Sequence, residues 1–148
     1  MERKIRNSAK ALIIKGDKML VSKINDKGDI FYIMPGGGQN VGELLEETVI
    51  RECAEELGVE VKPKSLEFVV EGMKGESFHR VDLVFLCDYI GEIKNVKLNR
   101  DKNQVGAKWI SIENLINEPL YPKKLKIQIM HLFNSEKTEV YLGNENME

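Results

Sequence analysis

The sequence predicts a single domain of the α/β class, covering residues 1–148. Its 148 residues, 42% hydrophobic and 31% charged, match the size of one ordinary globular domain with one core. Short runs rich in Val, Ile, Leu and Phe recur between turn residues, as β-strands do. Residues 44–57 instead follow a helical period. Strands and helices are therefore expected along one chain.

The N-terminal part begins with a predicted β-hairpin. Apolar runs at 9–14 and 19–24 flank Lys15-Gly16-Asp17-Lys18, whose Gly-Asp pair suits a tight turn. A third run, 31–34, stops at Pro35 and three glycines. We therefore expect a strand that leads into a loop with unusual backbone freedom.

A helix over 44–57 follows, and Gly58 occupies its expected C-terminal cap. The elements expected after it are two long strands at 59–70 and 78–90 joined near Gly72 and Gly75, a polar loop at 101–103, a strand at 105–110, a short helix near 112–116, a break at Pro119 and Pro122, and a helix at 123–133. The tail after about residue 135 is polar enough to be flexible unless a strand forms at 138–142.

Composition disfavours several classes of protein. The formal charge of -2 gives no reason to expect a nucleic acid partner, and no run of eighteen apolar residues suggests a membrane span. No apolar run follows the N-terminus as in a signal peptide, so a cytoplasmic location is expected. Cys53 and Cys87 lie far apart in apolar segments and are expected to be buried thiols. His79 and His131 are isolated, so neither is assigned to a metal site.

The helix carries the candidate chemistry. At about 100° per residue, positions 55 and 56 lie near about −60° and +40° from Glu52, so Glu52, Glu55 and Glu56 share one face. Residues 49, 50, 53, 54 and 57 form an adjacent apolar stripe that can anchor the helix to a sheet.

Three carboxylates this close repel one another, and a hard divalent cation with oxygen ligands would relieve the repulsion. Mg²⁺ commonly binds between carboxylates and substrate phosphates, and a backbone carbonyl of the glycine run would be a further ligand. For the RExxEE string alone, the solvated side of an amphipathic helix is the favoured interpretation.

A longer spacing reverses that preference. Gly37, then Glu43 after five residues, then Arg51-Glu52-Cys53-Ala54-Glu55-Glu56-Leu57-Gly58-Val59 after seven more, resembles the complete box of the Nudix (MutT-like) hydrolases. The order of strands, the Pro-Gly-Gly-Gly entry and the segment Trp109-Ile110-Ser111 are also similar to that family. The resemblance spans most of the chain.

The resemblance implies an α/β/α sandwich with a mixed central sheet and a loop-helix-loop metal site. Glu52, Glu55 and Glu56, with the carbonyl of Gly37, would hold Mg²⁺ or Mn²⁺, and these three glutamates would be the catalytic residues, led by Glu52. Glu43 and Arg51 would pair to brace the loop against the helix. Many members are homodimers, but no residue here identifies an interface.

The implied activity is metal-dependent hydrolysis of a diphosphate linkage in a small nucleotide-like substrate. A nucleoside triphosphate, or a nucleoside diphosphate joined to another group, is expected. We propose His79, Arg80 and Lys108 as candidate cations for the departing phosphate, and Phe31, Tyr32, Phe78 and Trp109 as candidates for base stacking or core packing.

Three alternatives remain open. The first is a nucleotide-sensing or protein-binding module without turnover, although such relatives often lose a box glutamate and this chain keeps all of them. The second is an RNA pyrophosphohydrolase, disfavoured by the weakly acidic composition. The third is an isoprenoid diphosphate isomerase, for which no cysteine lies near the acidic site.

Overall fold

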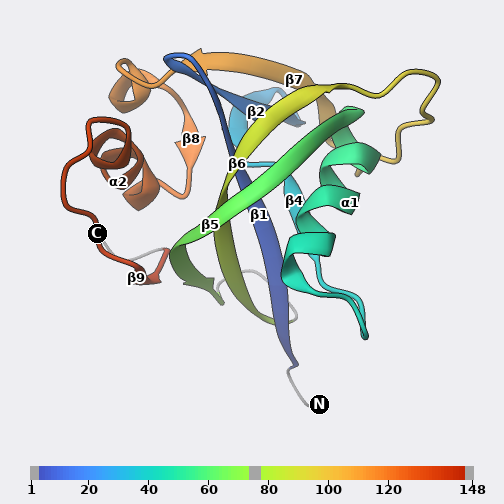
Figure 1. Ribbon diagram of the computed structural model, residues 1–148, viewed down its shortest axis with the longest axis horizontal. Helices are drawn as coiled ribbons and strands as arrows, with labels where there is room; N and C mark the ends of the chain where they lie inside the picture. The colour runs from blue at the N-terminus through green and yellow to red at the C-terminus, as the bar shows by residue number, and fades with distance from the viewer. Residues whose placement is uncertain (1–3, 74–77, 146–148) are drawn as a thin grey trace.

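The computed structural model describes residues 4–73 and 78–145, which form one curved sheet with two α-helices (Figure 1). The elements are β1 (Ile5–Lys15), β2 (Lys18–Asp26), β3 (Asp29–Ile33), β4 (Gly36–Gly38), α1 (Leu45–Leu57), β5 (Val59–Gly72), β6 (His79–Glu92), β7 (Gln104–Ser111), a 3-10 turn (Leu115–Asn117), β8 (Leu120–Tyr121), α2 (Lys124–Phe133) and β9 (Tyr141–Asn144).

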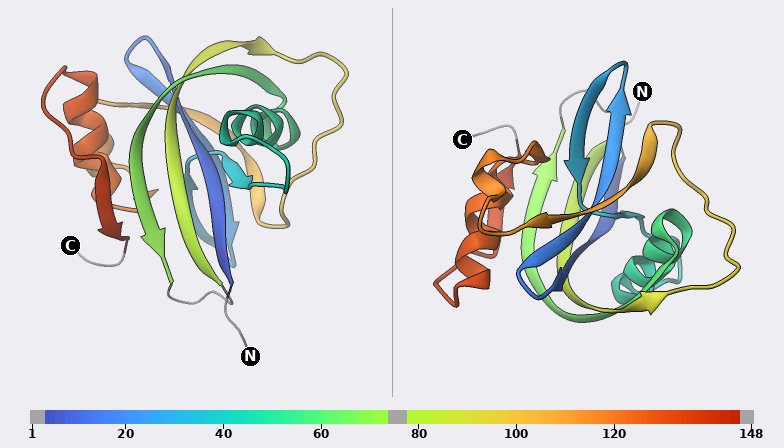
Figure 2. Two further views of the ribbon diagram at one scale, coloured as in Figure 1. Left: turned by 60° about the horizontal axis from the view of Figure 1, so that its bottom comes forward. Right: turned by 90° about the horizontal axis from the view of Figure 1, so that it is seen from above.

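The sheet is mixed. Its main order is β8-β3-β2-β1-β6-β5-β9, with β4 paired to β1 and β7 paired to β2. The β1–β6, β3–β8 and β5–β9 pairs are parallel, and the others are antiparallel. Figure 2 shows α1 and α2 on opposite faces of the curved sheet. The predicted α/β/α sandwich with a mixed central sheet is thus confirmed.

Alternation along the strands divides the core into two layers. On β1, Ala11 and Ile13 belong to the layer with Val49 and Cys53 of α1, whereas Leu12 belongs to the layer that contains α2. This follows from the period of two in a strand, which sends successive side chains to opposite faces. Both faces of the sheet are therefore covered by a helix.

The predicted elements agree with the structure except in a few places. The glycine run was expected to be a loop, but Gly36–Gly38 forms β4 and pairs with Ser8–Lys10 of β1. A Cβ on Gly36 would lie 2.8 Å from the Cα of Lys10, so only glycine lets the two backbones come this close. The short helix expected near 112–116 is a 3-10 turn at Leu115–Asn117. Ile50, expected in the apolar stripe of α1, is 42% exposed.

The C-terminal segment forms a strand that begins three residues later than the one considered from sequence. β9 lies parallel to β5, and the Lys124 ammonium donates to the carbonyls of Leu142 and Asn144, both at 2.7 Å. The link expected near Gly75 lies outside the described residues.

Cys53 and Cys87 are free thiols with 0% and 1% exposure, as expected from their apolar surroundings. Within residues 4–73 and 78–145, neither helix is long and apolar enough to cross a bilayer.

Candidate active site

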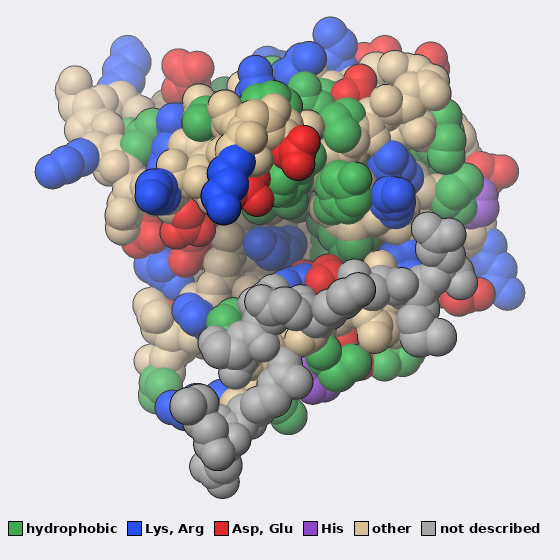
Figure 3. Space-filling model, turned by 180° about the vertical axis from the view of Figure 1, so that it is seen from behind, with side chains coloured by type: hydrophobic (Ala, Val, Ile, Leu, Met, Phe, Trp, Pro, Cys, Tyr) green, Lys and Arg blue, Asp and Glu red, His purple; other side chains and the backbone are tan. Residues whose placement is uncertain are grey.

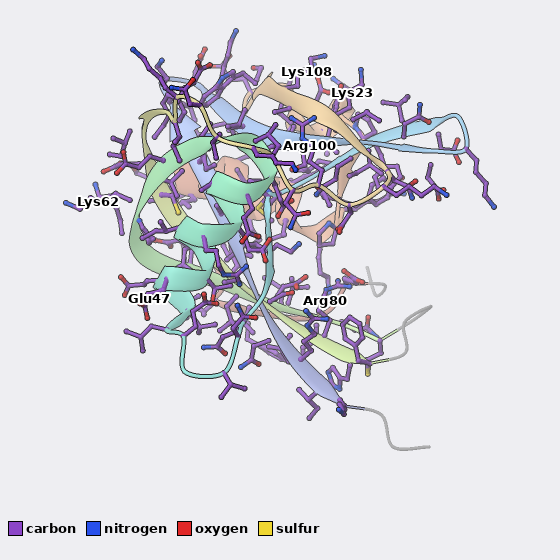
Figure 4. The ribbon with its side chains drawn as sticks, turned by 90° about the vertical axis from the view of Figure 1, so that its right-hand side faces the viewer. Lys23, Glu47, Lys62, Arg80, Arg100 and Lys108 are labelled. Atoms are coloured by element: carbon purple, nitrogen blue, oxygen red, sulfur yellow. The ribbon has the colours of Figure 1, made fainter. Side chains whose placement is uncertain are left out.

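Helix α1 is capped at both ends by residues of its own sequence. The Glu47 carboxylate accepts a hydrogen bond from the Leu44 backbone N–H at 2.8 Å, which satisfies a free donor at the start of the helix. Gly58 ends the helix with a φ of 65°, in the left-handed region. Figure 4 shows Glu47 near one end of α1 and Arg100 near the other. The helix is therefore fixed at both ends around its glutamates.

Glu52, Glu55 and Glu56 line one cavity of about 470 Å³, together with Gly36–Gly38 of β4. The other lining residues are Arg6, Ser8 and Lys10 of β1, then Phe78, Asn99 and Asp101. Figure 3 shows the molecule from behind, with a hollow in which basic and acidic side chains gather. The predicted convergence of the three carboxylates and the glycine run is thus observed, while their catalytic roles stay a prediction.

Glu56 is the most buried of the three carboxylates, at 5% exposure. One oxygen accepts a hydrogen bond from the Gly36 backbone N–H at 3.2 Å, and the other accepts one from the Gln104 side-chain amide at 2.5 Å. Burial raises the pKa of Glu56 to about 7, although the bond from Gln104 and the charge of Lys10 oppose the rise. Glu56 therefore joins α1 to both β4 and β7.

Arg51 braces the loop before α1 against the helix, as the resemblance implied. Its guanidinium makes a two-point contact with Glu43, with Nε to Oε2 at 2.8 Å and Nη2 to Oε1 at 3.0 Å, and Nη2 also donates to the Gly38 carbonyl at 3.0 Å. Hydrogen bonds from Arg51 and then Thr48 lower the pKa of Glu43 to about 2.

Arg51 also reaches the acidic cluster itself, which the sequence analysis had not assigned to it. Its Nη1 lies 2.9 Å from Glu52 and 3.3 Å from Glu55. Arg51 therefore offsets part of the repulsion between these carboxylates.

Gly37 is constrained by the cluster. A Cβ at this position would lie 2.5 to 2.7 Å from three carboxyl atoms of Glu52. Any side chain there would displace Glu52, so the absence of one permits close contact between β4 and α1.

The cations beside the glutamates differ from the candidates chosen by sequence. His79 contacts Glu71 at 2.7 Å, Arg80 contacts Asp82 at 2.9 Å, and Lys108 lies 3.4 Å from the Tyr32 hydroxyl. None of these three residues lines the cavity, and Figure 4 shows Arg80 and Lys108 well apart.

Arg6 and Lys10 line the cavity instead. The period of two along β1 sends Arg6, Ser8 and Lys10 to one face of the strand, but what that face meets depends on how β1 pairs. They come from a strand more than forty residues before the glutamates on the chain, so spacing could not reveal them.

The aromatic candidates lie in different parts of the structure. Phe78 lines the cavity, and the Arg6 guanidinium lies 5.5 Å from the centre of its ring. Tyr32 is buried in the core, and Trp109 packs edge-on against Tyr89 at 5.2 Å. Only Phe78 among the four lies beside the glutamates.

The side chains around the cavity fit a divalent cation by charge and by chemistry. The lining holds four carboxyl groups, those of Glu52, Glu55, Glu56 and Asp101, and two basic side chains, those of Arg6 and Lys10. Carboxylate oxygens are the ligands that Mg²⁺ prefers. Within the part of the chain that the structure describes, no three acidic, His or Cys side chains are already gathered closely enough to hold an ion. Coordination of a divalent cation by these carboxylates stays a prediction.

Comparison with known proteins defines the class. The NUDIX domain family matches residues 4–132. Nudix hydrolase 6 of Arabidopsis thaliana is 30% identical over 106 residues, and ADP-ribose pyrophosphatase of Methanocaldococcus jannaschii is 35% identical over 106 residues. Each match covers 70% of this chain, but only 36% and 60% of those two proteins respectively.

A solved structure agrees with this assignment. A NUDIX hydrolase from Nitrosomonas europaea has a TM-score of 0.73 and 22% identity, with 89% of this chain and 90% of that one covered. At that identity the likeness supports the fold alone. Together with the family match, these findings place the chain in the NUDIX domain family. Nudix hydrolases generally use divalent metal ions and act on small nucleotide-like substrates.

Proposed function

We propose that the protein is a divalent-metal-dependent pyrophosphohydrolase. Its substrate would be a nucleoside triphosphate, or a nucleoside diphosphate linked to another group, cleaved at a diphosphate linkage. The observation that carries this proposal is the cavity in which three helix glutamates and a glycine strand face two cations of β1. The pyrophosphatase named among the relatives is consistent with it.

Glu52, Glu55 and Glu56, with the carbonyl of Gly37, are the residues proposed to hold Mg²⁺, and Mn²⁺ has the same ligand preference. When bound, the ion supplies positive charge to the diphosphate and activates a water molecule. The carboxylates of the lining explain the need for the ion, because they would otherwise repel an anionic diphosphate.

The protein's own side chains then position the reactants. Arg6 and Lys10 lie on the β1 side of the cavity, where they can bind phosphoryl oxygens opposite the carboxylates. Glu52 is proposed to orient the water and accept its proton as the oxygen attacks phosphorus and the phosphoanhydride bond breaks. Arg51 would hold Glu52 in position through its contact at 2.9 Å.

A substrate screen tests the proposal. Nucleoside triphosphates, nucleotide sugars, ADP-ribose, dinucleotides and dinucleoside polyphosphates are incubated with Mg²⁺, with Mn²⁺ or with EDTA, and the products are identified. Hydrolysis that depends on the metal is expected. Base-selective binding without a product under any condition would instead favour a sensing module.

The variant Glu52→Gln is expected to lose several orders of magnitude in turnover with its fold intact. Glu46→Gln is the matched control, because Glu46 lies on the same helix, is exposed and does not line the cavity. Near-normal turnover by Glu52→Gln would remove Glu52 from the mechanism. A cytoplasmic location, the absence of a nucleic acid partner and a homodimer remain predictions.

A further inference from the structure

A second cavity of about 470 Å³ adjoins the glutamate site at Arg6, which lines both cavities. Gly38, the last residue of β4, lines the first cavity, and Gln39, the next residue along the chain, lines the second. The second cavity lies between residues 5–7 of β1 and the loop 39–43, and we call it the amide cavity because Asn7, Gln39 and Asn40 line it. A group joined to a phosphate beside Arg6 can extend into it.

The Arg6 guanidinium is available to bind that phosphate. It lies 5.5 Å from the centre of the Phe78 ring and against Gly38, where an added Cβ would collide with it. Within residues 4–73 and 78–145, Arg6 makes no ion pair with a carboxylate, whereas Arg51 pairs with Glu43. A guanidinium binds phosphate oxygens through parallel N–H donors. Arg6 therefore offers an uncompensated cation at the boundary between the two cavities.

Hydrogen bonds fix the wall of the amide cavity. The Gln39 backbone N–H donates to the Asn7 carbonyl at 3.0 Å, and the Asn7 side-chain amide donates to the Gln39 Oε1 at 3.1 Å. The Gln39 Nε2 donates to the Glu43 carbonyl at 2.7 Å. The Glu43 N–H donates to the Asn40 carbonyl at 3.1 Å, which closes a turn. The loop is therefore held in place before any ligand binds.

The carboxylate of Glu43 is already paired. It is the one carboxylate among the described residues that line the amide cavity. It accepts two hydrogen bonds from Arg51, at 2.8 and 3.0 Å, and one from the Thr48 hydroxyl at 2.6 Å. Apart from Arg6, the cavity therefore offers a ligand no charged group that lacks a partner.

The remaining walls are uncharged amides and apolar side chains. Within the described part of the chain, the Asn40 side-chain amide makes no hydrogen bond, so its donors and its acceptor are open to a ligand. Ile5 and Val41 are exposed apolar residues of the same lining. The cavity therefore combines open amide groups with apolar surface.

An uncharged group rich in hydroxyls fits this lining best. Amides both donate and accept hydrogen bonds, as hydroxyls do, and the C–H faces of a sugar ring can pack against Ile5 and Val41. A nucleobase would find no ring to stack on, because none of the described lining residues is aromatic. A further phosphate would find no cation except Arg6.

We propose that the amide cavity binds an uncharged, hydroxyl-rich group such as a sugar, joined to the diphosphate that is cleaved beside it, with Asn40 as a specificity-determining residue. The inference rests on the proposed function. Of the two substrate classes named there, it selects a nucleoside diphosphate linked to such a group over a nucleoside triphosphate. Arg6 would bind the phosphate that carries the group.

The first test measures binding without turnover. Calorimetry with Mg²⁺ compares ribose 5-phosphate and glucose 1-phosphate with methyl phosphate, none of which contains a diphosphate linkage. The proteins are the wild type, Asn40→Ala and Asn134→Ala. Asn40 is exposed and its turn is held by backbone groups, so the thermal midpoint of Asn40→Ala should match that of the wild type. Asn134 is the matched control, because it is exposed and lines neither cavity.

The wild type and Asn134→Ala are expected to bind at least one sugar phosphate about tenfold more tightly than methyl phosphate. Asn40→Ala should reduce that preference about threefold to tenfold, because it removes hydrogen-bonding groups and little else. Equal binding of the sugar phosphates and methyl phosphate by the wild type would overturn the inference. So would a preference that Asn40→Ala leaves unchanged.

The second test measures turnover of ADP-glucose and ATP, which share the adenosine diphosphate and differ in the group joined to it. The ratio of kcat/KM for ADP-glucose to that for ATP should fall about threefold to tenfold in Asn40→Ala and stay constant in Asn134→Ala. Metal-dependent hydrolysis with an unchanged ratio would overturn the inference and leave the proposed function standing. A sugar-phosphate preference that depends on Asn40, without hydrolysis of any compound in the substrate screen, would refute the proposed hydrolysis and leave the sugar site standing.

Discussion

The buried carboxylate of Glu56 predicts a measurable dependence of stability on pH. Its pKa is about 7 in the folded protein against an ordinary value of 4.5. The folded state therefore holds this proton more tightly than the unfolded chain. The resulting stabilisation is fully present below pH 4.5 and is lost as the pH rises to about 7.

The size of the effect follows from the shift. One pKa unit corresponds to about 1.4 kcal/mol, so ionisation of Glu56 should remove about 3 kcal/mol of the free energy of unfolding across this range. The variant Glu56→Gln cannot ionise and should lack this slope. Other groups titrate in both proteins, so the difference between the two profiles isolates Glu56.

The assay is urea unfolding in EDTA at pH 4.5 to 8, followed by the fluorescence of the single tryptophan, Trp109. The wild type should lose stability relative to Glu56→Gln as the pH rises, and added Mg²⁺ should weaken that loss because it favours the ionised carboxylate. A constant difference from pH 4.5 to 7.5 in EDTA would refute the assignment of a raised pKa to burial of Glu56.

Three further predictions test the surroundings of the site. Glu43→Gln should lower the thermal midpoint at pH 7. The difference in midpoint between this variant and the wild type should shrink as the pH falls from 4.5 to about 2, because the stabilisation from the lowered pKa of Glu43 is lost there. A difference that stays constant with pH would contradict the pairing with Arg51. Gly37→Ala should cost about 1–3 kcal/mol and reduce turnover by displacing Glu52, whereas Gly106→Ala, with open space around its added Cβ, should do neither. Burial raises the pKa of Cys87 to about 12 and also raises the pKa of Cys53 well above its ordinary value. Both thiols should therefore react with a thiol reagent only as fast as the protein unfolds, and rapid labelling of the native protein would contradict their burial.

Local sequence determined the parts of the site that lie on one element. Glu52, Glu55 and Glu56 share a face because a helix repeats every 3.6 residues, and Gly58 ends that helix because a left-handed residue suits its cap. The hairpin of β1 and β2 also follows from short-range pattern and turn chemistry. These features need no knowledge of distant contacts.

Tertiary structure alone decided which other residues meet the glutamates. Arg6 and Lys10 arrive from β1 and Gln104 from β7, each through pairing between segments far apart on the chain. No local period encodes such pairing, since a strand's side chains alternate in the same way whichever neighbour it has. The sequence by itself therefore determined the acidic helix face, and only the folded sheet decided which cations and which amide surround it.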